Sequence, residues 1–205
     1  MNAAPAMAYS AMADADVMLR AGAGDDAAFD YLVRKFRRPV IGFLYRACAN
    51  QAVAEEMAQE VFLRVYRSRA GYSAEAKFTT WLYRIAANLA MNQARDTRLE
   101  RQGNAVSLDA TPDSDDAAPL DVADAAATAE QELLRQERLA AIRDCVMQLP
   151  ERQRVAVLMH KFQEMDYRQI AAVLRLSESA TKSLLFRAYE TLRVQLRPFV
   201  ERGAR

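Results

Sequence analysis

Apolar residues recur along most of this 205-residue chain at the spacing that places them on one face of an α-helix. The pattern predicts a short helix after Ala13, helices over 25–47, 52–69 and 78–95, and about four more over 130–200. Helix-favouring Ala, Leu, Arg, Glu and Gln dominate, whereas β-branched runs and hairpin dipeptides are lacking. We therefore expect an all-α protein. We expect Asp14 or Asp16 to cap the first helix. Of the later apolar faces, one holds Leu133, Leu134, Ala141, Ile142 and Val146, and the next holds Val155, Leu158, Met159 and Phe162. Pro39 leaves open whether its helix is kinked or a new one begins.

The most informative pattern lies between Met165 and Tyr189, where we predict two short helices joined by a tight turn. Asp166 and Gln169 have the spacing of a capping box at the start of the first helix. Ser177 is a good N-cap for the second helix. The positions expected to face the interior are Tyr167, Ile170, Ala171 and Leu174 in the first helix, and Thr181, Leu185, Ala188 and Leu192 in the second.

The opposite face of the second helix combines small hydroxyls, an aromatic ring and cations. These residues are Ser179, Lys182, Ser183, Phe186 and Arg187. Such side chains near the start of a second helix suit contacts with base edges and phosphates in the DNA major groove. The alternative is an ordinary helical hairpin with a solvated polar face. Arg175 stands in the turn, where Gly is common, and a left-handed backbone there costs about 1 kcal/mol.

The predicted helix over 78–95 has a second polar face of interest. Phe78, Trp81 and Leu82 begin its apolar stripe, while the opposite side carries amides between guanidiniums: Arg84, Asn88, Asn92 and Arg95. With the preceding loop, which includes Tyr72 and Lys77, this face could hydrogen-bond bases and hold an unstacked base. A face that is merely solvated is the alternative here too.

Charge divides the chain into four blocks. Residues 1–30 have a net charge of −4, residues 31–101 of +7, residues 102–134 of −8 and residues 135–205 of +6. Two basic blocks separated by an acidic strip predict two domains that face polyanions. We expect a disordered tail over 1–13, a first domain over 14–98, a flexible acidic linker over 99–129 and a second domain over 130–200.

Other classes of function find little support in the residues. Cys48, Cys145 and His160 are isolated, which predicts no metal site and no cofactor, and fits reduced thiols in the cytoplasm. We find no glycine-rich phosphate loop and no paired nucleophile and base, so an enzyme is not expected. No apolar run is long enough for a membrane span, and no secretion signal is evident.

Four segments in order resemble the extracytoplasmic-function sigma factors of bacteria, the small sigma factors that have only regions two and four. They read QEVFLRVYR from Gln59, FTTWLYRIAANLAMN from Phe78, LPERQRVAVL from Leu149, and YRQIAAVLRLSESATKSLLFRA from Tyr167. Asn92 stands where the family often has Asp, and Leu184 where many members have Arg. These departures leave the preferred promoter sequence open.

The resemblance implies a role for each block. Region two would bind core RNA polymerase and melt the −10 element with the loop and polar face described above. Region four would dock its second helix on the −35 element of promoter DNA. The resemblance assigns polymerase docking to Glu56, Gln59, Glu60 and Arg64. It also implies control by an anti-sigma factor. The main alternative is a stand-alone helix–turn–helix regulator.

Overall fold

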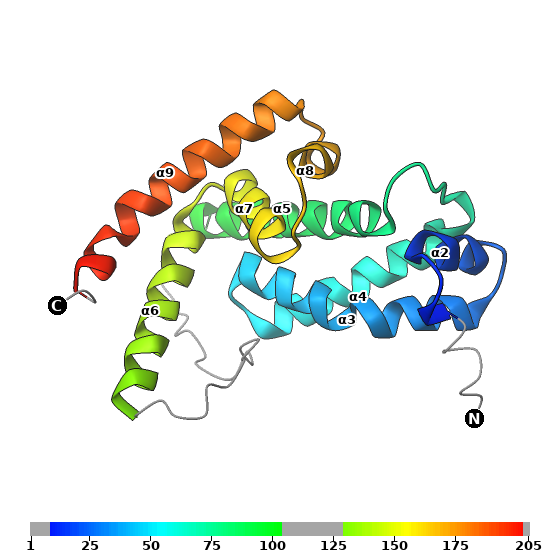
Figure 1. Ribbon diagram of the computed structural model, residues 1–205, viewed down its shortest axis with the longest axis horizontal. Coiled ribbons are helices and arrows are strands. Elements are labelled where there is room, and N and C mark those ends of the chain that lie inside the picture. The colour runs from blue at the N-terminus through cyan, green and yellow to red at the C-terminus, as the bar shows by residue number, and fades with distance from the viewer. Residues whose placement is uncertain (1–8, 104–128, 203–205) are drawn as a thin grey trace.

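The computed structural model describes residues 9–103 and 129–202, and its helices are shown in Figure 1. The expected all-α fold is confirmed for these residues, which contain no strand. The helices are α2 (Asp14–Gly22), α3 (Asp26–Cys48), α4 (Gln51–Ser68), α5 (Phe78–Gly103), α6 (Ala129–Gln148), α7 (Glu151–Phe162), α8 (Tyr167–Leu174) and α9 (Glu178–Arg202), with a 3-10 turn, η1 (Arg69–Gly71). Residues 1–8 of the predicted tail and 104–128 of the predicted linker lie outside the described residues, and α5 continues into the predicted linker as far as Gly103.

The N-terminal half is built from α2 to α5, with α3 and α4 lying side by side and α5 packed along them (Figure 1). Side chains fix the helix starts: Asp25 accepts a hydrogen bond from the Ala28 amide at 3.1 Å, and Asn50 accepts one from Val53 at 3.0 Å. Pro39 lies inside α3, which is one helix from Asp26 to Cys48, so it does not begin a new one.

Two expectations for the N-terminus are wrong. The N-cap of α2 is Ala13, which makes no side-chain cap, rather than Asp14 or Asp16. The predicted tail is ordered from Tyr9 onward, because the Tyr9 ring is buried and its hydroxyl donates to the Asp25 carboxylate at 2.8 Å. This hydrogen bond lowers the pKa of Asp25. The aromatic ring therefore closes the end of the helical core beside α3.

The C-terminal half contains the helix–turn–helix as predicted. Asp166 and Gln169 form both hydrogen bonds of the capping box, and the Ser177 hydroxyl accepts from the Ala180 amide at 3.1 Å. Arg175 has a φ of 53°, so a non-glycine residue occupies the left-handed turn. The side chains expected to anchor the second helix, Thr181, Leu185, Ala188 and Leu192, are buried.

Four residues of the predicted apolar faces are exposed instead. They are Leu133 and Ile142 of α6, Phe162 of α7 and Tyr167 of α8. Phe162 ends α7, and its ring lies 4.4 Å from the guanidinium carbon of Arg46 in α3. A cation therefore covers one face of this ring in place of the apolar partner that the spacing suggested.

The two halves pack directly against each other. Helices α7 and α8 contact α5, and α7 also contacts α3. The buried residues of both halves belong to one continuous cluster, which runs from Phe43 and Tyr83 to Val155 and Leu158. This arrangement places the helix–turn–helix beside the start of α5 (Figure 1).

Candidate nucleic-acid interface

The polar face predicted on α5 lies along the outer side of that helix. Asn88, Asn92 and Arg95 are exposed, while Arg84 is half-buried at the edge of the stripe. The opposite side of α5 faces the core, where five of its residues are buried: Leu82, Tyr83, Ala86, Ala87 and Ala90. Arg95 donates to the Asn92 side chain at 3.3 Å. The helix thus presents amide and guanidinium groups in one row, and we call this row the α5 stripe.

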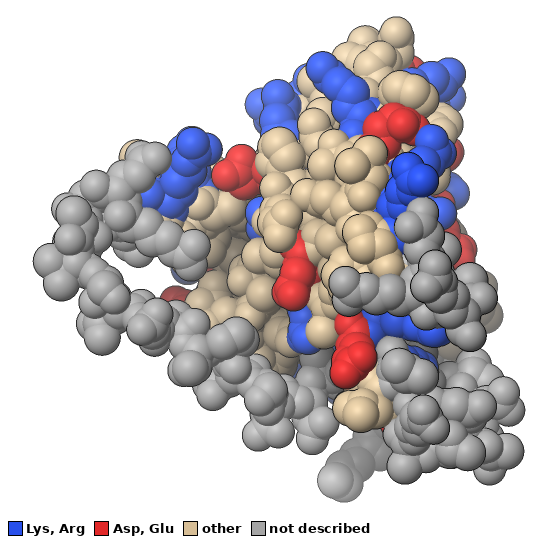
Figure 2. Space-filling view, turned by 90° about the vertical axis from the view of Figure 1, so that its left-hand side faces the viewer, with Lys and Arg blue, Asp and Glu red and all other residues tan. Residues whose placement is uncertain are grey.

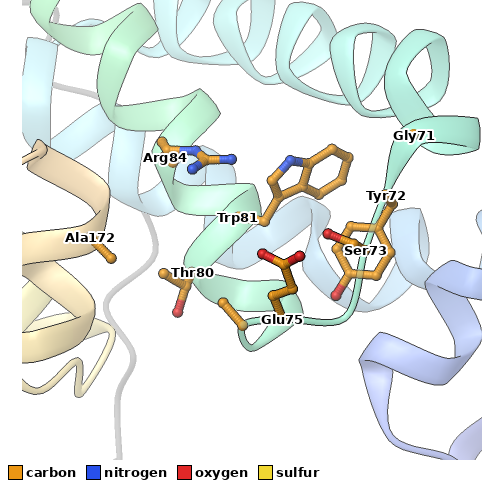
Figure 3. A pocket seen from close by; sticks show the side chains of 9 residues that line it. Gly71, Tyr72, Ser73, Glu75, Thr80, Trp81, Arg84 and Ala172 are labelled. Carbon is orange, nitrogen blue, oxygen red and sulfur yellow. The ribbon is translucent and has the colours of Figure 1, made fainter.

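A hollow of about 200 Å³ lies at the start of the α5 stripe (Figure 3). Its walls are the loop from Gly71 to Ala76, the first turns of α5 and Ala172 of α8. Figure 3 shows the Glu75 carboxylate below the Trp81 indole and the Arg84 guanidinium beside that ring. An aromatic face beside hydrogen-bonding groups can hold an unstacked base.

Tyr72 and Lys77 differ in where the loop places them. Lys77 is exposed directly before α5. Tyr72 is buried, with its ring centroid 5.0 Å from that of Trp81 and 6.2 Å from that of Phe78. Burial raises the pKa of its hydroxyl, which has no hydrogen-bond partner among the described residues. Tyr72 therefore packs against Trp81 while it also lines the hollow, and its predicted contact with single-stranded DNA stays a prediction.

The second predicted surface, on α9, is open to solvent along its whole predicted length. Ser179, Lys182, Ser183, Phe186 and Arg187 are all exposed, and Phe186 keeps 67% of its surface accessible. Lys182 pairs with Glu178 one turn earlier at 3.0 Å. Figure 2 looks at the side on which α6 and α9 lie in Figure 1, and Lys and Arg side chains gather over its upper part.

A groove of about 450 Å³ runs between α3 and α4. Of the residues predicted to dock on polymerase, Gln59 lines it, while Glu56 and Arg64 are exposed and Glu60 pairs with Arg64 at 2.7 Å. The groove also has an apolar floor that was not predicted, formed by Phe29, Val33, Ile41, Phe62, Leu63 and Tyr66. Leu63 and Tyr66 could have revealed it, because these apolar residues lie outside the buried stripe of α4.

The remaining reactive side chains have structural partners. His160 Nδ1 lies 2.7 Å from the Tyr189 hydroxyl, and burial lowers the pKa of the imidazole. Burial raises the thiol pKa of both cysteines, which disfavours the thiolate. Within residues 9–103 and 129–202 no group of three or more potential metal ligands occurs. None of the described helices is both long and apolar enough to cross a membrane.

Both polar surfaces lie in segments of the chain that match known protein families. The family model for Sigma-70 region 2 matches residues 32–100, and the model for Sigma-70 region 4 matches residues 139–192. The RNA polymerase sigma-H factor of Pseudomonas aeruginosa is 32% identical over 189 residues, covering 91% of this chain and 95% of its own. The sigma-E factor of Escherichia coli K12 is 26% identical over 192 residues, covering 93% and 98%.

Solved structures agree on the fold. CnrH, solved in complex with the cytosolic domain of CnrY, superimposes with a TM-score of 0.65 at 19% identity, covering 91% of this chain and 99% of its own. RpoE of Bartonella quintana, solved with the anti-sigma factor NepR, gives 0.61 at 17% identity, covering 82% and 96%. The chain belongs to the extracytoplasmic-function group of RNA polymerase sigma factors, the subunits that direct transcription initiation at promoters.

Proposed function

We propose that this sigma factor divides promoter recognition between its two exposed polar surfaces. The α5 stripe and the hollow beside it would capture the unpaired strand of the −10 element. The observation that carries this proposal is the row of exposed amides and guanidiniums beside an indole-walled hollow, within the segment that matches region 2. Bases captured there would offset the cost of unstacking, which is a few kcal/mol.

The exposed face of α9 would enter the major groove of the −35 element. Lys182 and Arg187 would meet phosphates or guanine edges, and Phe186 would make apolar contact with base edges. Lys182 would exchange its ion pair with Glu178 for a phosphate, an exchange between exposed charges that costs little free energy.

Core RNA polymerase would dock on the groove between α3 and α4. The groove offers an apolar floor with Glu55, Gln59 and Arg37 at its margins, which fits an amphipathic helix with charges on both edges. Glu56, Glu60 and Arg64 would make exposed contacts along the same helix. The polymerase would then position region two and region four on one DNA, which raises the effective concentration of the second contact.

These roles require binding and no covalent chemistry, so we propose that the chain is not an enzyme and acts in the cytoplasm together with the polymerase. We also propose control by an anti-sigma factor. Of the structural relatives, RpoE was solved with the anti-sigma factor NepR, and CnrH with the cytosolic domain of CnrY. The α3–α4 groove is the surface on which a partner would compete with polymerase.

The test is run-off transcription with purified bacterial core polymerase on a library of promoter fragments at fixed salt. We expect transcripts that begin downstream of a shared pair of sequence boxes. A matched reaction should use a Leu63→Glu variant, which places a charge in the α3–α4 groove at an exposed position. Duplex binding by the chain alone, with no response to core polymerase, would contradict the proposal and indicate a stand-alone regulator.

A further inference from the structure

The end of α2 lies against the turn of chain that leads into the hollow. Gly22 is the last residue of α2, and Arg69 begins η1, the 3-10 turn between α4 and the hollow. A Cβ atom on Gly22 would lie 2.6 Å from the carbonyl oxygen of Arg69 and 3.4 Å from its carbonyl carbon. A side chain does not fit at the first of these distances, so glycine allows α2 and η1 to touch (Figure 1).

Space, rather than backbone freedom, accounts for glycine at position 22. Gly24, two residues later, has a φ of 99° and open space where a Cβ would point, so it serves the turn that ends the helix. Gly22 lies within α2, and its φ is not in the left-handed region. Glycine weakens a helix relative to alanine, so its presence here fits the need for close approach.

Arg69 connects this contact to Tyr72, which lines the hollow (Figure 3). The carbonyl oxygen that lies against Gly22 also accepts a hydrogen bond from the Tyr72 amide at 3.2 Å. Burial raises the pKa of the Tyr72 hydroxyl, and the acidic side chains in the first turn of α2 raise it further, so α2 also runs beside this residue. Because the Tyr72 ring packs against Trp81, the shape of the hollow depends on where α2 holds the Arg69 carbonyl.

The side chain of Arg69 holds η1 from a second direction. Its guanidinium carbon lies 3.6 Å from the centre of the Tyr66 ring, and its Nη1 donates to the Tyr66 carbonyl at 2.8 Å. A cation over an aromatic ring and a hydrogen bond to the same residue restrict the guanidinium to one position. The backbone of Arg69 is thus held by α2 and its side chain by α4.

We propose that Gly22 and Arg69 are positioning residues for the hollow, which place Tyr72 and Trp81 for capture of an unpaired base. Neither Gly22 nor Arg69 lines the hollow, so both act through the residues that do. This inference rests on the proposed function, because it takes the hollow as the site where the unpaired strand of the −10 element binds. It adds that α2, which belongs to neither polar surface, takes part in −10 recognition.

The experiment replaces Gly22 by Ala and measures two quantities. Trp81 is the only tryptophan of the chain, so acrylamide quenching of fluorescence in the free full-length chain reports how well Tyr72 covers the indole. We expect stronger quenching than in the parent. Holoenzyme binding to fork-junction DNA with an unpaired −10 strand and no −35 element should weaken about tenfold, comparable to the loss of one base stack. Binding to a duplex −35 element should not change.

The matched control is Gly42→Ala, the same substitution inside α3. A Cβ at this position would lie 2.9 Å from the end of the Arg46 side chain, which can move aside, whereas the Arg69 carbonyl belongs to the backbone. This control should keep the quenching and both DNA affinities of the parent. The comparison therefore separates the contact with η1 from the general effect of alanine in a helix.

A second pair of variants tests the same positions if Gly22→Ala does not fold. Arg69→Ala should also increase quenching and weaken fork-junction binding, because η1 loses its hold on Tyr66. Arg69→Lys keeps a cation over that ring and should restore part of the binding. Arg67→Ala removes an exposed cation two residues earlier and is the control for charge.

The ratio of the two DNA affinities separates positioning from stability, since a folding defect would weaken binding of both DNA forms equally. The inference is wrong if folded Gly22→Ala and Arg69→Ala variants keep the quenching and fork-junction affinity of their controls. It is also wrong if they lose both DNA affinities to the same extent. If the parent holoenzyme does not bind the fork-junction fragment, the proposed function fails instead, and acrylamide quenching alone decides whether Gly22 and Arg69 position Tyr72.

Discussion

The exposed face of α9 and the α5 stripe differ in how much of each lies in open solvent. On α9 all five predicted contact residues are exposed, whereas on α5 the stripe begins at half-buried Arg84, beside a hollow whose wall includes Ala172 of the other region. A duplex has a fixed outer shape that an open helix face can match. An unpaired strand offers separate bases, which a hollow with an aromatic wall can hold one at a time. The difference in exposure thus matches the difference in the form of DNA that we propose for each surface.

The largest expected effect is on duplex recognition by α9. Replacing Arg187 by Ala should weaken holoenzyme binding to promoters with a −35 element by about 10- to 100-fold, the range for loss of a base or phosphate contact. Binding of fork-junction DNA that lacks the −35 element should not change. Arg138→Ala, which removes an exposed cation from α6, is the control for net charge. Equal losses for both variants would mean that α9 contributes only general charge.

The second effect concerns the α5 stripe. Asn88→Ala combined with Asn92→Ala removes two exposed amides without altering the net charge, and should weaken capture of single-stranded −10 DNA about tenfold. Binding to the duplex −35 element should be unchanged. Gel shifts with single-stranded and duplex probes at one salt concentration separate the two quantities. If binding of the duplex probe weakened as much as binding of the single-stranded probe, the assignment of the two DNA forms to two surfaces would be wrong.

The two halves of the chain can also be compared by their backbone. In each half one helix ends at a residue other than glycine that adopts the left-handed conformation. These residues are Ala49 after α3, with a φ of 55°, and Arg175 after α8, with a φ of 53°. Replacement of either residue by Gly should raise the free energy of unfolding by roughly 0.5 to 1 kcal/mol, because glycine adopts this conformation without strain. Urea unfolding measures both. A decrease for Arg175→Gly would show that its side chain stabilises the turn.

The smallest effect is a pH dependence confined to region four, which has the only histidine of the chain. Burial, aided by Lys161, lowers the pKa of His160 below its ordinary value of 6.5. The unfolded chain therefore binds this proton more readily. The contribution of His160 to stability is present above pH 6.5 and declines as the pH falls through the lowered pKa.

Urea midpoints between pH 7.5 and pH 5 should therefore fall less for His160→Gln than for the parent chain. The Tyr189 hydroxyl, the Tyr167 ring and Lys161 surround this imidazole, and burial raises the pKa of Tyr189. If the urea midpoint of the variant changed with pH as steeply as that of the parent, carboxylates elsewhere would control the pH dependence of stability.

Local features of this fold were predictable from the sequence, because they depend on neighbouring residues. The capping box at Asp166 and the N-cap at Ser177 follow from side chains that bond backbone amides three residues away. The exposed row on α5 follows from helical spacing alone. The family resemblance then assigned these surfaces, an assignment that remains a prediction residue by residue.

Features that depend on contacts between distant segments were not predictable. Helical spacing placed Phe162 in the core, but α7 ends there and Arg46 from the other half covers the ring. Tyr72 was expected on a surface loop, yet the loop turns its ring under Trp81. The Arg154 guanidinium donates to the carbonyl of Ala47, 107 positions away, and no periodic pattern carries that information.

The division of tasks between the two surfaces is tested most directly by permanganate reactivity of promoter thymines near −10, measured beside promoter binding in the same holoenzyme sample. With the Asn88→Ala, Asn92→Ala variant we expect promoter binding within a few-fold of the parent, while the thymines stay unreactive because the unpaired strand is not captured. Thymines as reactive as with the parent, or a loss of binding that matches the loss of reactivity, would contradict the account.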